Sequence, residues 1–163
     1  MYAGVRETKI TKMHELNLPP RHFKIRETEG RRYIFDNLRK KYVALTPEEW
    51  VRQHFTAFLI HDKHYPAGRT GNEISLLLNQ RKRRCDTVIY GSNGKPVAIV
   101  EYKAPGIPIT QDVFDQIVRY NMVFRVSFLI VSNGLVHYCC RIDYDTQQYF
   151  FLKDIPDYSE LEV

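Results

Sequence analysis

Two runs rich in valine, isoleucine and tyrosine, at residues 84–90 and 96–103, flank a polar segment at residues 91–94 that reads Gly-Ser-Asn-Gly. β-Branched and aromatic residues favour strands, whereas the polar segment has the composition of a tight turn. The pattern therefore predicts a β-hairpin. A hairpin folds the chain back on itself, so polar residues of the first strand come to lie beside polar residues of the second.

Helical periodicity marks two other segments. The first begins at residues 46–49, Thr-Pro-Glu-Glu, which carry the features of a helix N-terminus with a capping box, and it continues to about Asp62. Its apolar residues at helical spacing are Val51, Phe55, Phe58 and Leu59. Glu49 and Gln53, four residues apart, lie on another face of this helix and are available to a functional site.

The second predicted helix starts at Thr110, whose hydroxyl can cap its first turn. Asp112 follows in that turn, where the helix dipole favours a negative charge. The stripe that we expect to be buried consists of Val113, Ile117, Tyr120 and Phe124.

The pattern in the rest of the chain predicts further strands and an N-terminal arm with a hairpin. Strands are predicted at residues 74–78, 126–131, 135–142 and 148–152, the last two as a closing hairpin. Residues 1–22 indicate an irregular arm, and residues 23–36 a short hairpin around Glu29-Gly30. We therefore expect an α/β protein in which an arm and hairpin at 1–41 pack on a core domain at 42–163.

Length, charge and cysteines narrow the class of protein only slightly. The 163 residues suit one domain, and a net charge of +5 suits an anionic partner, although it also describes many proteins that bind no nucleic acid. Three cysteines without a Cys-x-x-Cys spacing indicate a reducing, cytoplasmic setting and no zinc site. No run approaches the roughly 20 apolar residues of a membrane helix.

The predicted hairpin carries the candidate chemistry of the chain. Glu101 and Lys103 are two residues apart in a strand, so their side chains share one face, while Tyr102 points to the other. The hairpin brings Asp86 toward them. Two converging carboxylates repel unless a cation such as Mg²⁺ or Mn²⁺ neutralises them. The alternative for Glu-x-Lys alone is a solvated strand edge with an ordinary ion pair.

These residues resemble the motif of PD-(D/E)XK nucleases, in which Asp86, Glu101 and Lys103 would be the catalytic set. A Gln-x-x-x-Tyr element, Gln116 to Tyr120, resembles the one that follows the catalytic strands in the N-terminal nuclease domain of type I restriction enzyme R subunits. Residues 42–53 look like the opening helix of that domain. The resemblance implies a restriction-endonuclease-like αβββαβ core with a mixed central sheet flanked by helices.

The resemblance also implies hydrolysis of DNA phosphodiester bonds with Mg²⁺, for which Mn²⁺ would substitute. Asp86 and Glu101 would ligate the metal, and Lys103 would orient the attacking water or stabilise charge in the transition state. Gln116 and Tyr120 would position the scissile phosphate, unless Tyr120 belongs mostly to the core. The proline that names the family is Cys85 in this chain, a frequent replacement among relatives.

Several further residues have two interpretations each. The basic residues Arg69, Arg81, Lys82, Arg83 and Arg84 would hold DNA phosphates, or the run at 81–84 is only a soluble lead into its strand. Glu49 and Glu73 are possible additional acids, or a helix cap and a turn residue respectively. His61 and His64 are expected to be plain surface residues rather than metal ligands.

The sequence has no phosphate-binding Gly-x-x-x-x-Gly-Lys-Ser/Thr loop, so the translocation motor of type I R subunits is not expected in it. The protein would then be a nuclease by itself or one that works with a separate translocase or specificity protein. It would otherwise be a non-catalytic nucleic-acid-binding or assembly module on the same fold. A protein-interaction domain without a nucleic-acid partner is the third possibility.

Overall fold

A six-stranded mixed sheet forms the centre of the protein in the computed structural model, which describes residues 13–161. Its strands, in spatial order, are β4 (Thr70–Leu78), β5 (Arg81–Tyr90), β6 (Pro96–Tyr102), β7 (Phe128–Ser132), β8 (His137–Asp143) and β9 (Gln148–Phe151). Neighbouring strands are antiparallel except β6 and β7, which are parallel. Parallel neighbours need a crossover connection, and a helix supplies it here.

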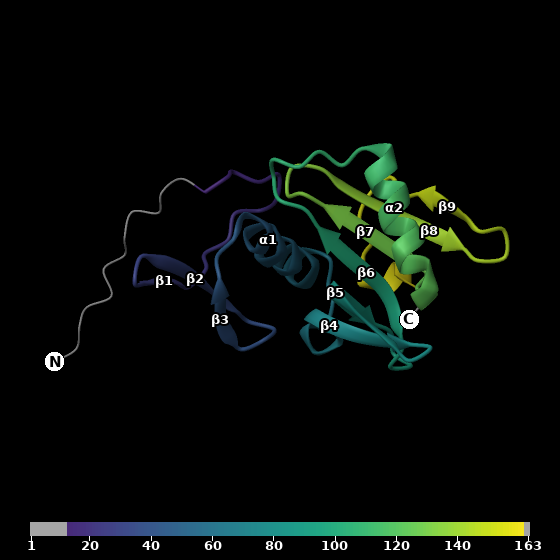
Figure 1. Ribbon diagram of the computed structural model, residues 1–163, viewed down its shortest axis with the longest axis horizontal. Coiled ribbons are helices and arrows are strands. Elements are labelled where there is room, and N and C mark those ends of the chain that lie inside the picture. Colours follow the sequence, from purple (N-terminus) through teal and green to yellow (C-terminus); the bar gives the residue numbers. More distant parts are fainter. Residues whose placement is uncertain (1–12, 162–163) are drawn as a thin grey trace.

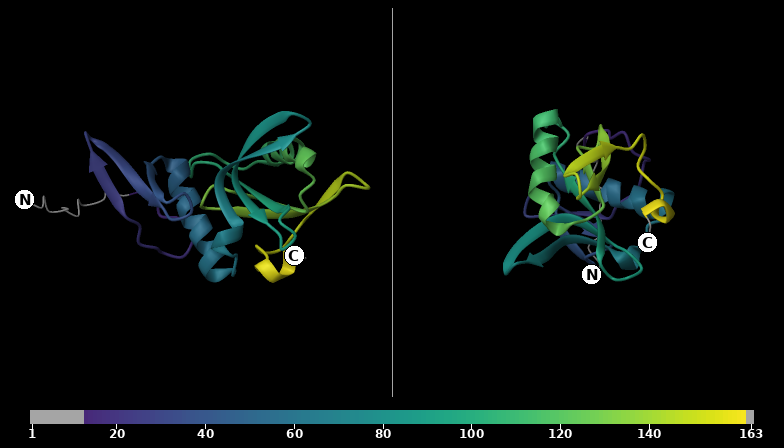
Figure 2. Two further views of the ribbon diagram at one scale, coloured as in Figure 1. Left: turned by 90° about the horizontal axis from the view of Figure 1, so that it is seen from below. Right: turned by 90° about the vertical axis from the view of Figure 1, so that its right-hand side faces the viewer.

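Two helices cover opposite faces of this sheet (Figures 1 and 2). They are α1 (Pro47–Asp62), which precedes β4, and α2 (Gln111–Asn121), which forms the crossover from β6 to β7. Side chains along β6 alternate between the two faces, so Val100 and Tyr102 join the cluster under α1, whereas Ile99 joins the cluster under α2. Short 3₁₀ helices are η1 (Ala67–Arg69), η2 (Met122–Phe124) and η3 (Tyr158–Leu161).

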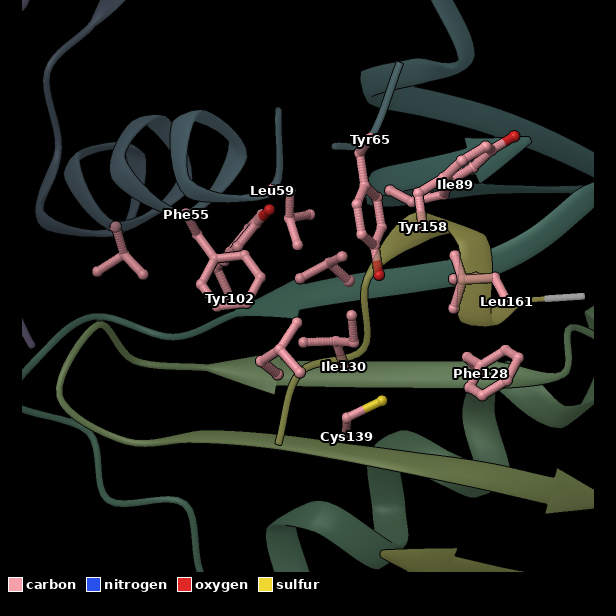
Figure 3. Close-up of a cluster of buried hydrophobic side chains, with 14 residues drawn as sticks. Phe55, Leu59, Tyr65, Ile89, Tyr102, Phe128, Ile130, Cys139, Tyr158 and Leu161 are labelled. Atoms are coloured by element: carbon pink, nitrogen blue, oxygen red, sulfur yellow. The ribbon is translucent and has the colours of Figure 1, made fainter. Parts of the chain in front are cut away.

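The hydrophobic cluster beneath α1 also fixes the C-terminal segment (Figure 3). Phe55 of α1 packs edge to face against Tyr102 of the sheet, with ring centroids 5.9 Å apart. The hydroxyl of Tyr65 donates a hydrogen bond of 3.0 Å to the carbonyl of Pro156, and that of Tyr158 donates one of 3.0 Å to the carbonyl of Tyr90. Burying a side chain of this size contributes about 1.5–3 kcal/mol, so the tail is part of the core.

A second, three-stranded antiparallel sheet precedes α1. It consists of β1 (Ile25–Thr28), β2 (Arg31–Asp36) and β3 (Lys41–Ala44). The predicted turn at Glu29-Gly30 joins the first two strands, and Gly30 has φ +73°. The helix begins at Pro47 after the Thr46 cap, as the capping box predicted. The extension of this helix to residue 42, which the family resemblance implied, was wrong, because residues 42–44 pair with β2. Short apolar runs fit either element until a partner strand is known.

The α/β fold and its mixed sheet are confirmed, with shifts at some boundaries. β4 begins at Thr70, four residues before its predicted start, and β7 and β8 each begin two residues later than predicted. Residues 13–22 form no regular element, and the rest of the predicted arm lies outside the described residues. All three cysteines are buried free thiols. Among residues 13–161, no helix has the length and hydrophobicity that a membrane crossing requires.

The buried stripe of α2 differs from the predicted one by a rotation of one residue. Phe114 and Val118 face the sheet together with Asn121, whereas Tyr120 is 49% exposed. The prediction that Tyr120 belongs to the buried stripe was therefore wrong. The reason is that the side of α2 carrying Val113, Ile117 and Tyr120 lines a pocket instead of the sheet.

Candidate active site

Strand register brings the two predicted metal ligands together. Thr87 pairs with Val100 across the β5–β6 hairpin, which places Asp86 opposite Glu101 at the next position. The carboxylate of Asp86 continues this pairing, because its Oδ2 accepts a hydrogen bond of 2.9 Å from the backbone N–H of Tyr102. The backbone N–H of Lys103 donates to the carbonyl of Ser132 at 2.9 Å. The backbone of Tyr102 and Lys103 is thus held by the two neighbouring strands, through Asp86 on one side and Ser132 on the other.

A pocket of about 500 Å³ lies between this edge of the sheet and α2. Its lining includes the five residues that the sequence suggested for catalysis: Asp86, Glu101, Lys103, Gln116 and Tyr120. It also includes two polar residues that sequence reasoning missed, Glu48 and Asn121. Neither had a distinctive signal, since Glu48 looks like an ordinary first-turn acid and Asn121 lies at the helix C-terminus.

Two buried oxygen atoms in this pocket are acceptors without donors. Oε1 of Glu101 and Oδ1 of Asn121 have no hydrogen-bond partner among residues 13–161. Burial, followed by the negative charge of Asp86, raises the pKa of Glu101 well above its ordinary value. Burial and the same Asp86 charge also raise the pKa of Glu48. Such unsatisfied acceptors are rare in folded proteins, and a bound cation or its water would satisfy them.

These residues fit a hard divalent ion. Mg²⁺ prefers oxygen ligands, retains several waters and is commonly held by one or two protein carboxylates together with substrate phosphates. Asp86 and Glu101 provide that number of carboxylates. Within the described chain, no group of three His, Cys, Asp or Glu side chains is arranged to hold a metal ion. Two carboxylates would supply part of a coordination sphere, and water and substrate would supply the rest.

Arg52 of α1 is a further residue that the sequence did not single out. Its guanidinium is buried, and Nη2 lies 3.3 Å from Oδ1 of Asp86 and 2.6 Å from Oε1 of Glu73. Its Nη1 donates to the carboxylate of Glu49. Asp86 is therefore held from two sides, by Arg52 at one oxygen and by the Tyr102 backbone at the other.

The two possible additional acids are engaged in ion pairs and do not line the pocket. Glu49 is buried between Arg39 and Arg52, and its backbone N–H donates to Oγ1 of Thr46 at 3.0 Å. The cap on α1 is thus formed by threonine, while the glutamate side chain turns away from it. Glu73 has φ +56°, a rare conformation for a non-glycine residue, and pairs with Arg52 and with Arg84 at 2.6 Å each.

The predicted phosphate-binding residues divide into two places. Arg69 donates a hydrogen bond of 3.1 Å to the hydroxyl of Tyr158 and so holds the C-terminal segment. Of the run at residues 81–84, Arg83 lies beside the pocket, because its guanidinium is 4.1 Å from the ring centroid of Tyr120. His61 and His64 are exposed, as expected for surface residues, and His64 pairs with Asp157 at 2.6 Å.

A mixed sheet covered by helices on both faces, with carboxylates on adjacent central strands, defines a restriction-endonuclease-like fold. Residues 47–156 match the family described as type I restriction enzyme R protein N terminus (HSDR_N), and the chain belongs to that family.

One solved structure supports the fold. It is "the fragment structure of a putative HsdR subunit of a type I restriction enzyme" from Vibrio vulnificus YJ016, and it superposes with a TM-score of 0.51 at 20% sequence identity. The match covers 72% of the present chain and 25% of that chain, so the present chain spans about a quarter of its structural relative. No curated protein sequence matches.

Proposed function

We propose that this protein is a metal-dependent nuclease that hydrolyses phosphodiester bonds of DNA. The observation that carries the proposal is the unpaired, buried Oε1 of Glu101, which lies next to Asp86 in a pocket that also holds Lys103. A buried carboxylate oxygen without a donor costs stability, and a divalent ion at Asp86 and Glu101 would offset that cost. The family of type I R proteins supports the same reaction class.

Mg²⁺, when bound, would lower the pKa of a coordinated water and neutralise charge on the phosphate. The residues of the chain have separate roles around it. Asp86 and Glu101 hold the ion, and Arg52 fixes the orientation of Asp86. The ammonium of Lys103 stabilises negative charge at the phosphate oxygens. Gln116 and the exposed Tyr120, one helical turn apart on α2, position the phosphate or a flanking nucleotide.

We also propose DNA as the macromolecular partner and a separate translocase or specificity protein as a second partner. The support is the family itself, since the R protein and its structural relative are described as parts of a type I restriction enzyme. The pocket contains no arrangement that reads base edges, so sequence choice would come from another protein.

Cleavage of circular DNA tests the reaction. Supercoiled duplex and circular single-stranded DNA are incubated with Mg²⁺ or Mn²⁺ and with wild type, Glu101→Gln or Lys103→Ala, and linear DNA is included to detect attack at ends. We expect nicking or linearisation by wild type and a loss of about 100-fold or more in both variants, because each removes charge stabilisation worth several kcal/mol. The matched controls are Glu27→Gln and Lys95→Ala, which remove the same charges at exposed sites.

Metal binding separates the nuclease from a non-catalytic module on the same fold. Calorimetric titration with Mn²⁺ should show one site in wild type and its loss in Asp86→Asn. Absence of both cleavage and Mn²⁺ binding, with DNA still retained, would replace the proposal with the binding module. Mn²⁺ binding that is unchanged in Asp86→Asn would contradict the assigned ligands.

A further inference from the structure

The β4–β5 hairpin extends beyond the sheet as a two-stranded ribbon. β5 pairs with β6 only from Thr87 onward, whereas residues 81–85 pair only with residues 74–78 of β4. We call residues 74–85 the β4–β5 arm. In two perpendicular views the arm stands out from the body of the sheet near the C-terminal end of α2 (Figures 1 and 2). The face of the arm that carries Ile74, Leu76 and Cys85 packs on the cluster under α2. Packing in the core does not account for the opposite face, on which Leu77 and Lys82 are exposed.

The tip of the arm is a tight turn. Asn79 and Gln80 have φ of +48° and +63°, and the flanking residues Leu78 and Arg81 are paired. Two central residues with positive φ are the signature of a type I′ turn, whose twist matches that of the strands. The arm is therefore a regular, twisted ribbon up to its last residue rather than a loose loop.

The arm combines positive charge on both faces with one exposed apolar side chain. Alternation along β5 places Arg81 and Arg83 on the face toward α2, and Lys82 and Arg84 on the opposite face. Arg83 and Arg84 contact Tyr120 and Glu73 near the base of the arm, whereas Arg81 and Lys82 are exposed near its tip. Leu77, the cross-strand partner of Lys82, is 72% exposed and is the most exposed of the large hydrophobic residues in the described chain.

We propose that the β4–β5 arm lies in the major groove of double-stranded DNA; this inference rests on the proposed nuclease function. The major groove, about 12 Å wide, admits a two-stranded β-ribbon, and phosphates line both of its walls. The long side chains of Arg81 and Lys82, near the tip of the arm, can reach these phosphates. Leu77 then meets apolar groups in the groove, such as thymine methyls, instead of water.

The distance between the tip of the arm and Asp86 is limited by the length of β5, which contains both. Asp86 follows the arm on the same strand, and Arg83 stacks on Tyr120 at the rim of the pocket. From Asp86 to Arg81 the strand rises about 17 Å, at roughly 3.3 Å per residue, which equals about five base steps of B-DNA. The arm should therefore contact the duplex within about five base pairs of the scissile phosphate.

The test measures DNA binding in EDTA, where no divalent ion supports cleavage. Anisotropy of labelled 20-base-pair duplex and of a single strand of the same length is recorded over a range of NaCl concentrations. For Arg81→Ala/Lys82→Ala we expect weaker duplex binding and a salt slope that is smaller by about 2, roughly 1 for each phosphate contact. For Leu77→Ala we expect about tenfold weaker duplex binding with an unchanged slope, since only apolar contact is removed.

Lys40→Ala/Lys41→Ala is the matched control, because it removes the same charge from two exposed positions where the turn after β2 enters β3. It should leave duplex binding and its salt slope near those of wild type. All substituted positions are exposed, and thermal unfolding verifies that each variant is folded. Footprinting with hydroxyl radicals locates the arm, and protection that disappears in the arm variants should lie within about five base pairs of the cut.

Arm variants that bind duplex as well as the control does would overturn the inference, and so would an equal loss for duplex and single strand. If the arm variants give this result and wild type still cleaves DNA, the inference about the arm fails while the proposed nuclease function stands. Conversely, arm-dependent duplex binding without cleavage in any metal supports the arm and removes the nuclease. Failure of the inference about the arm is thus distinguishable from failure of the proposed nuclease function.

Discussion

At the scale of single residues, the adjacent carboxylates Glu48 and Glu49 have different surroundings. Successive residues of a helix are rotated by about 100°, so one side chain reaches the pocket while the other lies buried between Arg39 and Arg52. We expect Glu48→Gln to weaken Mn²⁺ binding by about tenfold, as for groups adjacent to a metal ligand, and to leave stability nearly unchanged.

By contrast, Glu49→Gln should lower the free energy of unfolding. Glu49→Gln leaves the buried guanidinium of Arg52 and the partly buried one of Arg39 without their shared carboxylate, at a cost of about 3 kcal/mol. Urea unfolding and Mn²⁺ titration of both variants check the pair of predictions. Equal effects of the two variants on either measurement would contradict the division of roles.

Arg52 is expected to be the most important single side chain for the integrity of the site. Arg52→Met leaves the buried or partly buried carboxylates of Glu49, Glu73 and Asp86 without their common cation, and should lower the free energy of unfolding by about 3–5 kcal/mol. Arg21→Ala removes a more exposed ion pair with Asp62 and should cost about 1 kcal/mol or less. Urea denaturation measures the free energy of unfolding of both variants. A loss for Arg52→Met as small as that for Arg21→Ala would show that Arg52 is dispensable.

At the scale of elements, the turn between β2 and β3 links the small sheet to the large one through a buried carboxylate. Asp36 accepts hydrogen bonds from the backbone of Leu38 at 2.7 Å and of Arg39 at 3.1 Å. It also accepts one of 3.1 Å from Asn72 of β4. Burial alone would raise the pKa of Asp36, but the Arg39 side chain and these other hydrogen bonds together lower it below the ordinary 3.8.

This lowered pKa predicts how stability depends on pH. The stabilisation by ionised Asp36 is fully present above its unfolded-state pKa and is lost as pH falls through the lower folded-state value. Asp36→Asn should therefore be less stable than wild type by about 1–3 kcal/mol at pH 7, with a difference that shrinks below about pH 4. Chemical denaturation from pH 3 to pH 7 measures it, with Asp154→Asn as an exposed control. A difference that does not change with pH would rule out this role.

At the scale of the whole molecule, the site and the fold are thermodynamically linked. A ligand that binds only the folded state stabilises it by about 2.7 kcal/mol at a concentration 100 times its Kd. Mn²⁺ should therefore raise the unfolding temperature of wild type and of the control Glu27→Gln, but not that of Glu101→Gln. Thermal unfolding with Mn²⁺ and with EDTA makes the comparison. A metal-dependent rise that persists in Glu101→Gln would place the ion elsewhere.

Local signals were sufficient for the central hairpin and for the threonine caps of both helices. These features depend on residues within a few positions of one another, such as Thr110, whose hydroxyl accepts from the N–H of Val113 at 3.3 Å. The hairpin pattern likewise brought Asp86 toward Glu101, because a tight turn sets the pairing of the two strands that it joins.

Tertiary structure decided the features that depend on distant partners. It made residues 42–44 a strand by pairing them with β2, and it rotated α2 so that Tyr120 faces the pocket. It also placed Arg52 against Asp86, 34 residues away in sequence, and Asn121 beside the same pocket. The sequence by itself determined that Asp86, Glu101 and Lys103 come together, because strand alternation and turn composition are local. The packing of helices on the sheet determined which other side chains line the candidate pocket, because helix rotation is set by long-range contacts.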